Sequence, residues 1–372
     1  MTTTGTDSGR IRLGTRGSRL ALAQSGQVAE ALMAAGAPGE GSGARCDGLD
    51  IDLVTVRTDG DGDRTPLRQL GGVGVFAARL RHALLDGEVD MVVHSFKDLP
   101  TQPVEGLEVI CVPPREDPHD ALCGRNELTL AALPEGARVG TGSPRRAAQL
   151  LAARPDLEVV DLRGNVPTRL ARVRGLEAVG VGTDEPVAPS RADTIGDLDA
   201  VVLALSGLRR LGLEHCASEI LNLETMLPAP AQGALAVEAR AGECSTALAQ
   251  AVAALDDEPT RLAVTAERAL MARLGAGCAA PVGAWAHLRG GDREPRVLAL
   301  RAVVTSLDGG QEVGCELSTE LPEAAGGPDT SGDVAAEAVR AAEALGGRAA
   351  EVLLEDGAAE IVDLHANKPR RD

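Results

Sequence analysis

The stretch Met91–Pro100, MVVHSFKDLP, decides how the rest of the chain is interpreted. It begins with three apolar residues, a run typical of the end of a buried strand, and turns polar at His94. Pro100 has no backbone N–H, so the strand must end before it. Ligands of open α/β sheets bind at the carboxyl ends of strands, which places Lys97 and Asp98 where a ligand is expected. The alternative is a solvated Lys–Asp pair at an ordinary strand end.

Lys97 is one of only two lysines in the chain, the other being Lys368 near the end, and all remaining cationic side chains except histidine are arginine. Arginine offers a planar fork of donors, whereas lysine is a compact point charge. A lysine at this position therefore suggests that a point charge is needed there.

Composition narrows the class of protein. A length of 372 residues predicts two or three domains, and 44% hydrophobic residues suffice for cores built from aliphatic side chains. Aromatic residues make up only 1%, which argues against nucleic-acid binding by base stacking. The net charge of −18 also argues against a nucleic-acid partner or an anionic membrane.

The sequence also points to a cytoplasmic location. It contains no apolar run long enough to span a bilayer, and the N-terminus lacks the apolar core of a signal peptide. The seven cysteines are scattered, without a C-x-x-C pair, which fits a reducing compartment.

The first lobe is predicted from alternating strands and helices. A strand at residues 11–13 ends in the turn Gly14–Ser18, and a helix follows that Ser18 can cap. Arg16 and Ser18 thus occupy a strand-to-helix turn, where backbone N–H groups favour an anion. A second strand at residues 51–56 and a third at 89–94, with a helix between them, predict parallel pairing.

A second α/β lobe is predicted after the proline-rich crossing at residues 113–118. Its first strand, at residues 137–140, is followed by Thr141, Ser143, Arg145 and Arg146 at the start of a helix, with Pro144 suited to a first helical position. Two hydroxyls, free N–H groups and two arginines form a specific anion-site pattern.

Two further strands of this lobe also end in arginine. The strand at residues 157–162 leads to Arg163 and, one turn into a helix, Arg169; the strand at 198–205 leads to Arg210. One solvated arginine would need no explanation, but three equivalent strand ends predict a pocket for a ligand with several carboxylates or phosphates.

The remaining segments complete a three-domain prediction. Residues 175–196 look like a surface insertion with no assigned function, and residues 227–233 look like a second inter-domain crossing. Two helices, three antiparallel strands and a last helix follow, which predicts a small α+β domain. We therefore expect domain 1 at residues 10–113 and 228–251, domain 2 at 114–227, and domain 3 at 252–372.

Cys278 lies in the glycine-flanked loop Gly275–Pro281. Most lone cysteines are small core residues, which is the simple interpretation. A flexible loop, however, favours a reactive thiol, because the thiolate is the nucleophile.

Seven short motifs follow one another along residues 11 to 283. They are TRGSRLA at 15–21, VHSFKDLP at 93–100, GTGSPRR at 140–146, LRGNV at 162–166, GLRRLGL at 207–213, PAQG at 230–233 and GCAAPVG at 277–283. In these motifs and their order the chain resembles the hydroxymethylbilane synthase (porphobilinogen deaminase) family.

The resemblance implies an α/β fold with two lobes like those of solute-binding proteins, plus a third α+β domain with a three-stranded antiparallel sheet. It implies a transferase of porphyrin and heme biosynthesis that condenses four porphobilinogen molecules head to tail, with release of ammonia, into hydroxymethylbilane. The growing chain is held on a dipyrromethane cofactor, and Cys278 matches the cysteine that carries it through a thioether. The enzyme is expected to be a cytoplasmic monomer without a metal.

The resemblance also implies roles for individual residues. Asp98 matches the catalytic aspartate, whose carboxylate stabilises positive charge. The residues matched to cofactor binding are Cys278, Lys97, Asp98, Thr141, Ser143, Arg145, Arg146, Arg163 and Arg210. Those matched to substrate binding are Arg16, Ser18, Gln24, Phe76, Arg163, Arg169 and Gln232. Gln69 and Val73 depart from the family pattern, in which lysines are common in this loop.

A competing class is a non-catalytic, two-lobed protein that binds a small anion. It explains the lobes and the arginines. It gives no role to Asp98, to Cys278 or to the third domain, and a periplasmic binder would need a signal peptide.

Overall fold

The structure, a computed structural model, describes residues 10–36, 49–56, 75–176, 196–277, 280–291, 294–322 and 331–364. Contacts divide the chain into two units, and each is described by itself. Unit 1 comprises residues 1–63, 74–115 and 234–258, and unit 2 comprises residues 64–73, 116–233 and 259–372. The division into three domains stays a prediction.

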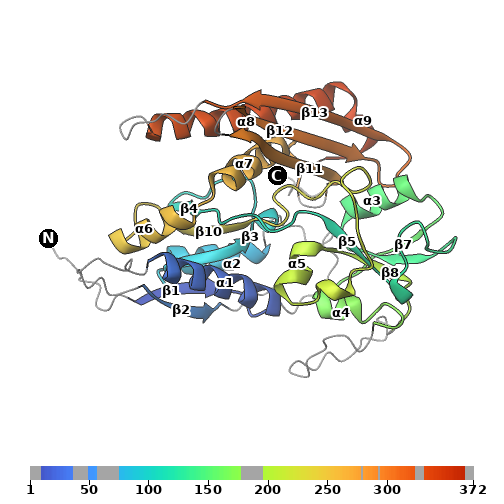
Figure 1. Cartoon of the computed structure of the whole chain (residues 1–372), viewed down its shortest axis with the longest axis horizontal. Helices are drawn as coiled ribbons and strands as arrows, with labels where there is room; N and C mark the ends of the chain where they lie inside the picture. Colours follow the sequence, from blue (N-terminus) through green and yellow to red (C-terminus); the bar gives the residue numbers. More distant parts are fainter. Residues whose placement is uncertain are drawn as a thin grey trace, which may run out of the picture. The chain divides into compact units, whose positions relative to one another are not determined.

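Unit 1 is built around a five-stranded sheet with the order β2-β1-β3-β10-β4 (Figure 1). Its strands are β1 (Arg10–Thr15), β2 (Asp50–Thr55), β3 (Met91–Ser95), β4 (Leu107–Cys111) and β10 (Leu235–Arg240). β1 pairs in parallel with β2 and β3, as predicted from the strand–helix–strand order. β10 is antiparallel to both of its neighbours.

Helices cover both faces of this sheet. One core joins α1 (Arg19–Ala35) and α6 (Thr246–Leu255) to the sheet, with Leu13, Met91 and Val237 among its buried residues. The other face packs against α2 (Val75–Leu85). Both faces of β3 are therefore buried, which explains why its sequence reads as a continuous apolar run rather than an alternating one.

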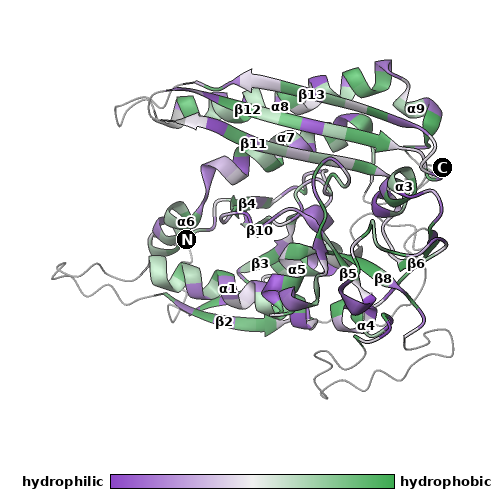
Figure 2. Cartoon of the chain, turned by 45° about the vertical axis from the view of Figure 1, so that its right-hand side comes forward, coloured by the Kyte–Doolittle hydropathy of each residue, from purple (hydrophilic) through white to green (hydrophobic). Residues whose placement is uncertain are grey.

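The first part of unit 2 has a sheet with the same pattern of strand directions, although its antiparallel inner strand comes first along the chain and that of unit 1 comes last. Its sheet has the order β7-β6-β8-β5-β9 and is formed by β5 (Asp120–Gly124), β6 (Arg138–Gly140), β7 (Glu158–Val160), β8 (Ala200–Ala204) and β9 (Glu219–Ile220). β6 is parallel to β7 and β8, whereas β5 is antiparallel to β8 and β9. The central strands are coloured hydrophobic in Figure 2. α3 (Pro144–Ala153) packs on one face, and α4 (Val166–Leu170) and α5 (Leu205–Arg210) pack on the other.

The second part of unit 2 is an antiparallel sheet of order β11-β12-β13 backed by helices. The strands are β11 (Val282–Gly291), β12 (Glu294–Thr305) and β13 (Glu312–Glu320), and the helices are α7 (Glu258–Leu274), α8 (Ser331–Glu355) and α9 (Ala358–Ile361). Alternate residues of the strands join α7 and α8 in one core. α8 runs along the sheet in Figure 1, and Gly346 lets it approach α7, because a Cβ there would lie 2.2 Å from the Ala266 carbonyl oxygen.

These sheets confirm the predicted fold class of two α/β lobes plus a small antiparallel α+β part. Several predicted residues lie outside the described part of the chain, namely Cys278, Gln69, Val73 and most of the insertion at residues 175–196. Phe76 belongs to α2, but its side chain is also outside the description.

Candidate functional site

In unit 1, predicted site residues gather at the carboxyl ends of β1 and β3. Arg16 directly follows β1, and Ser18 caps α1 by accepting a hydrogen bond from the Ala21 N–H at 3.3 Å. Gln24, buried in α1, exchanges hydrogen bonds of 3.0 and 3.1 Å with the hydroxyl of Ser95 at the end of β3. This bond ties the first helix to the strand that leads to Asp98.

Asp98 is presented by a short 3₁₀ turn at residues 96–98. Phe96 and Leu99 are buried on either side of it, and the Phe96 N–H donates to the Ala234 carbonyl at 3.0 Å. Burial of these two apolar residues fixes the turn, and the carboxylate of Asp98 is left exposed while Lys97 is half-buried. The geometry suits a carboxylate that must contact a ligand.

A buried ionic cluster behind this turn was missed by the sequence analysis. Glu238 of β10 receives three bonds of 2.8 to 3.0 Å from Arg81 of α2 and lies 3.1 Å from Nε2 of His94. Burial by itself would raise the pKa of the Glu238 carboxyl, but the hydrogen bonds and charges of His94 and Arg81 outweigh it and lower the pKa. The cluster fastens α2 to the two strands.

In unit 2, the turn after β6 is closely packed. A Cβ at Gly142 would lie 2.4 Å from the carbonyl oxygen of Leu162, so glycine is required for the turn to reach the end of the neighbouring strand. Ser143 donates its N–H to Thr141 Oγ1 at 3.2 Å, and its hydroxyl accepts the Arg146 N–H at 3.5 Å as the cap of α3. Thr141 and Ser143 are thus fixed at the carboxyl end of the sheet, as predicted.

Arg145 and Arg146 share one carboxylate, that of Asp120. Asp120 Oδ2 accepts from Arg145 Nη2 at 2.8 Å, and Oδ1 accepts from Arg146 Nε and Nη2 at 3.0 and 2.6 Å. Arg145 also donates to the Leu227 carbonyl at 2.5 Å, and Arg146 to the Val202 carbonyl at 3.1 Å. Both guanidinium groups are therefore held rigidly by the protein.

The charges in this cluster are strongly coupled. Asp120 has no exposed surface, and Arg145 and Arg146 are 3% and 6% exposed. Burial alone would raise the pKa of Asp120, but the two guanidinium groups hold it far below its ordinary value. Burial likewise lowers the pKa of Arg145, although Asp120 opposes that shift.

The second crossing brings Gln232 and Gly233 to the same place. Gln232 is fully buried, and its amide nitrogen donates to Asp120 Oδ1 and to the Pro118 carbonyl, both at 2.8 Å. Arg210 donates to the Gly233 carbonyl at 2.7 Å, and burial lowers the pKa of this arginine. Gly233 has a φ of 89°, and a Cβ there would lie 2.2 Å from the Glu116 carbonyl oxygen.

Arg163 and Arg169 lie after β7, around Gly164. Arg169 donates its Nε–H to the Gly164 carbonyl at 2.8 Å. Within the described part of the chain, Nε of Arg163 and Nε of Arg145 are buried without a hydrogen-bond partner. Buried donors are almost always satisfied in native proteins, so each of these two atoms needs an acceptor beyond the described residues, which a bound anion would supply.

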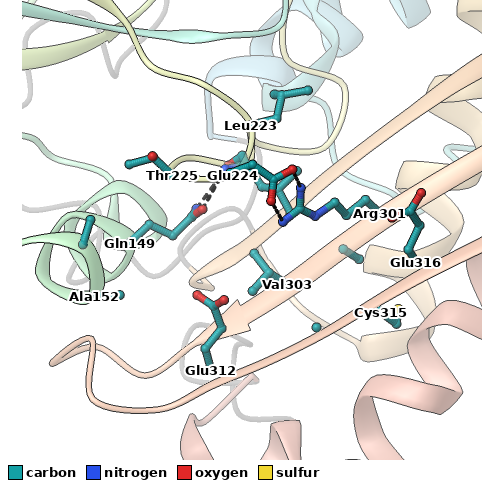
Figure 3. Close-up of a pocket in the computed structure, with 14 residues that line it drawn as sticks. Gln149, Ala152, Leu223, Glu224, Thr225, Arg301, Val303, Glu312, Cys315 and Glu316 are labelled. Carbon is teal, nitrogen blue, oxygen red and sulfur yellow. Dashed lines mark hydrogen bonds and ion pairs between the residues drawn. The ribbon is translucent and has the colours of Figure 1, made fainter.

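A separate cavity of about 520 Å³ lies in unit 2 among the end of α3, residues 223–227 and strands β12 and β13 (Figure 3). None of the predicted site residues lines it. Glu224, Glu312 and Glu316 surround it, and Arg301 is already bonded to Glu224. An acidic lining repels a polyanion, so this cavity is not the predicted site.

The described residues contain no group of three or more His, Cys, Asp or Glu side chains placed to hold a metal ion. They also include no helix that combines the length and the apolar character needed to cross a membrane.

In each α/β lobe the parallel strands therefore end in hydroxyl and arginine donors, an arrangement suited to an anion with several acidic groups. Comparison with known protein families identifies the family of α/β proteins to which the chain belongs. The model described as "Porphobilinogen deaminase, dipyromethane cofactor binding domain" matches residues 11–247, and "Porphobilinogen deaminase, C-terminal domain" matches residues 261–355. The chain belongs to the porphobilinogen deaminase family, whose members are transferases of tetrapyrrole biosynthesis.

Curated relatives align with the sequence of this chain over nearly its full length. A porphobilinogen deaminase of Cutibacterium acnes is 49% identical over 363 residues, covering 97% of this chain and 99% of that protein. One of Micrococcus luteus is 48% identical, covering 94% and 93%. Among solved structures, the methionine-binding protein MetQ aligns at 14% identity and a TM-score of 0.38, covering 67% of this chain and 91% of that one.

Proposed function

We propose that this chain condenses four porphobilinogen molecules head to tail, releasing one ammonia for each, to give hydroxymethylbilane on a dipyrromethane attached through a thioether to Cys278. The observation that carries the proposal is the set of fixed arginines at the ends of β6, β7 and β8, in which buried Nε donors of Arg145 and Arg163 await an acceptor. Porphobilinogen carries an acetate and a propionate, so a growing polypyrrole is a polyanion. An acidic protein with a net charge of −18 needs such a local cationic lining to hold it.

The residues present fit a carboxylate-bearing cofactor. Thr141, Ser143, Arg145, Arg146, Arg163 and Arg210 supply the donors of unit 2, and Lys97 supplies a point charge in unit 1. When bound, dipyrromethane supplies the pyrrole carbon to which the first substrate is joined. The forked donors of arginine bind carboxylates with fixed direction, which orients each pyrrole ring along the lining.

Asp98 acts on the reacting pyrrole. Its exposed carboxylate accepts the pyrrole N–H and stabilises the positive charge that develops as the amino group leaves as ammonia. The buried anchors Phe96 and Leu99 hold the carboxylate in place, so little reorganisation is needed during the reaction.

Substrate carboxylates are bound by Arg16, Ser18, Arg163 and Arg169, with Gln24 and Phe76 completing the set. Gln232 contributes indirectly. Its side chain is fully buried and bonded to Asp120, so it supports the arginine pair rather than touching the substrate.

The thioether assignment to Cys278 is supported by the burial of three other cysteines, whereas Cys244 is exposed. Cys111, Cys123 and Cys216 are buried. Burial raises the pKa of the Cys123 thiol to about 12 and also raises that of Cys216, so both stay protonated and unreactive at neutral pH. A thioether also resists hydrolysis while the product is cut free.

The experiment that tests the function is incubation of the purified protein with porphobilinogen. Hydroxymethylbilane should form with four ammonium ions released per product, and intact mass should show the dipyrromethane adduct before substrate is added. A protein at its bare sequence mass that binds porphobilinogen without releasing ammonia would favour the non-catalytic binder instead. Gel filtration tests the further proposal of a monomer, and cell fractionation tests the cytoplasmic location.

A further inference from the structure

The arginine pair at the start of α3 does not present two free charges. Asp120 bonds to both guanidinium groups, so the cluster of Asp120, Arg145 and Arg146 carries one net positive charge. The three side chains are almost entirely buried, so this cancellation is little weakened by solvent.

Topology explains how an acidic residue reaches a cationic edge. β5 runs antiparallel to β8, so the amino end of β5 lies at the same edge as the carboxyl ends of the parallel strands. Asp120 is the first residue of β5, and it is paired with Ala204 at the end of β8. The antiparallel strand thus carries its carboxylate into the ligand edge.

The carboxylate is also held in one orientation. Its Oδ1 accepts hydrogen bonds from Gln232 and Arg146, and its Oδ2 accepts one from Arg145. The Nη groups of Arg145 are directed to Asp120 and to the Leu227 carbonyl, which leaves Nε as the donor without a partner in the described part of the chain. The pair therefore offers an anion a restricted set of donors and one net charge.

We propose that Asp120 is a positioning residue that weakens the grip of Arg145 and Arg146 on ligand carboxylates, so that a growing polypyrrole can be passed along the site instead of being held at the pair. This rests on the proposed function, in which these arginines bind cofactor and substrate. Without the negative charge of Asp120, Arg145 and Arg146 would bind a ligand carboxylate more tightly and release it more slowly.

The test measures affinity separately from turnover. Porphobilinogen is titrated calorimetrically into the full-length Cys278→Ala protein, which has no cofactor to extend, with and without Asp120→Asn. Removing the negative charge should tighten binding about tenfold or more, because an added unit charge acts on the ligand at short range. In the enzyme with an intact Cys278, Asp120→Asn should lower both KM and kcat and should accumulate enzyme–substrate complexes in native mass spectra.

Asp199→Asn is the matched control. Asp199 is also buried, accepts from Arg125 Nε at 2.7 Å and from the Arg138 N–H at 2.9 Å, and directly precedes the amino end of β8. The Asp199→Asn protein should be less stable than the native protein but should bind porphobilinogen with the same affinity. A merely structural role for Asp120 would make the two variants behave alike.

Should Asp120→Asn fail to fold, the same change is made in an Arg146→Gln background, where it leaves the cluster with the native net charge of one. The double variant should bind porphobilinogen about tenfold more tightly than Arg146→Gln alone, because the same negative charge has been removed. Unchanged or weaker binding in folded Asp120→Asn, or in the double variant relative to Arg146→Gln, would overturn the inference. Failure of the Cys278→Ala protein with native Asp120 to bind porphobilinogen would instead count against the proposed function.

Discussion

Glu267 of α7 accepts the backbone N–H of Ala231 at 2.5 Å, and this bond fixes a residue whose φ of 61° is uncommon for anything but glycine. The second oxygen of Glu267 accepts the Ala286 N–H of β11 at 2.7 Å. A single fully buried carboxylate thus joins the crossing at residues 227–233 to the antiparallel sheet. Because Gln232 follows Ala231, the same bond supports the contact between Gln232 and Asp120.

Replacing Glu267 by Gln should lower the free energy of unfolding by roughly 2–3 kcal/mol, because the amide can accept at only one of its two positions and leaves a buried N–H unsatisfied. Urea unfolding followed by fluorescence would measure it, since Trp285 is the only tryptophan and neighbours Ala286. Glu351→Gln, which removes an exposed pair with Arg273, should unfold like the native protein. Equal stability of both variants would show that the Glu267 bonds contribute nothing.

Asp98→Asn should abolish turnover while the fold is kept. The side chain is exposed at the end of its turn, so the nearly isosteric change disturbs no packing. Losing a preorganised charge opposite a developing cation typically costs about 3–4 kcal/mol, or a hundredfold or more in kcat. The measurements are product formation and the urea midpoint, with the exposed Asp86→Asn as control. Near-normal product formation by a folded Asp98→Asn protein would remove this residue from the mechanism.

Arg145→Lys and Arg163→Lys should impair elongation, because lysine keeps the charge but loses the forked donors. Enzyme–substrate intermediates should accumulate and be visible by native electrophoresis or mass spectrometry. Arg154→Lys provides the comparison. This arginine bonds to Asp156 and to the Leu130 carbonyl, so its loss should affect stability alone. Native kinetics in both site variants would mean that these arginines do not orient the chain.

The buried Glu238 should give unit 1 a defined dependence on pH. Its pKa is lowered in the folded state from an ordinary value of 4.5, so its contribution is full above pH 4.5 and is lost as the pH falls through the folded pKa. Glu238→Gln should therefore destabilise the protein most at neutral pH, by roughly 3 kcal/mol, because Arg81 is left buried without its carboxylate.

The stability gap between native protein and Glu238→Gln should narrow as the pH is lowered from 4.5. Urea unfolding at a series of pH values would measure it. Glu88→Gln, which breaks an exposed pair with Arg79, should show no such trend. A gap for Glu238→Gln that stays constant with pH would contradict the lowered pKa.

The sequence was sufficient for features governed by local chemistry. Ser18 caps α1 and Pro144 begins α3, as predicted, and polar residues after apolar runs mark the carboxyl ends of parallel strands. The fold class followed from the order of these segments, since strand–helix–strand units pair in parallel.

The residues whose roles the sequence did not predict are placed by contacts between segments that lie far apart in the sequence. Asp120 lies 25 residues before Arg145, at the start of an antiparallel strand, where no strand-end pattern would look for a site residue. Glu267 is one of many charged residues on an amphipathic helix, and nothing local shows that it is the one buried. Gln232 was predicted to contact the ligand because it lies in a family motif. In the structure its amide nitrogen donates to Asp120 instead.

Cys278 carries the last prediction. A cofactor that stays attached while the product is released needs a bond that resists hydrolysis, which a thioether provides and an ester does not. The thiolate is also a soft nucleophile, and a free thiol with an ordinary pKa of about 8.5 is partly ionised at neutral pH. The purified protein should therefore exceed its sequence mass by two linked pyrrole units and should react with acidic aldehyde reagent as a dipyrromethane.

Cys278→Ala should have the bare mass and no activity. Substitution of the buried Cys111, Cys123 or Cys216 should leave the adduct in place. An active native protein without added mass, or an adduct that survives in Cys278→Ala, would show that the cofactor is not attached at this cysteine.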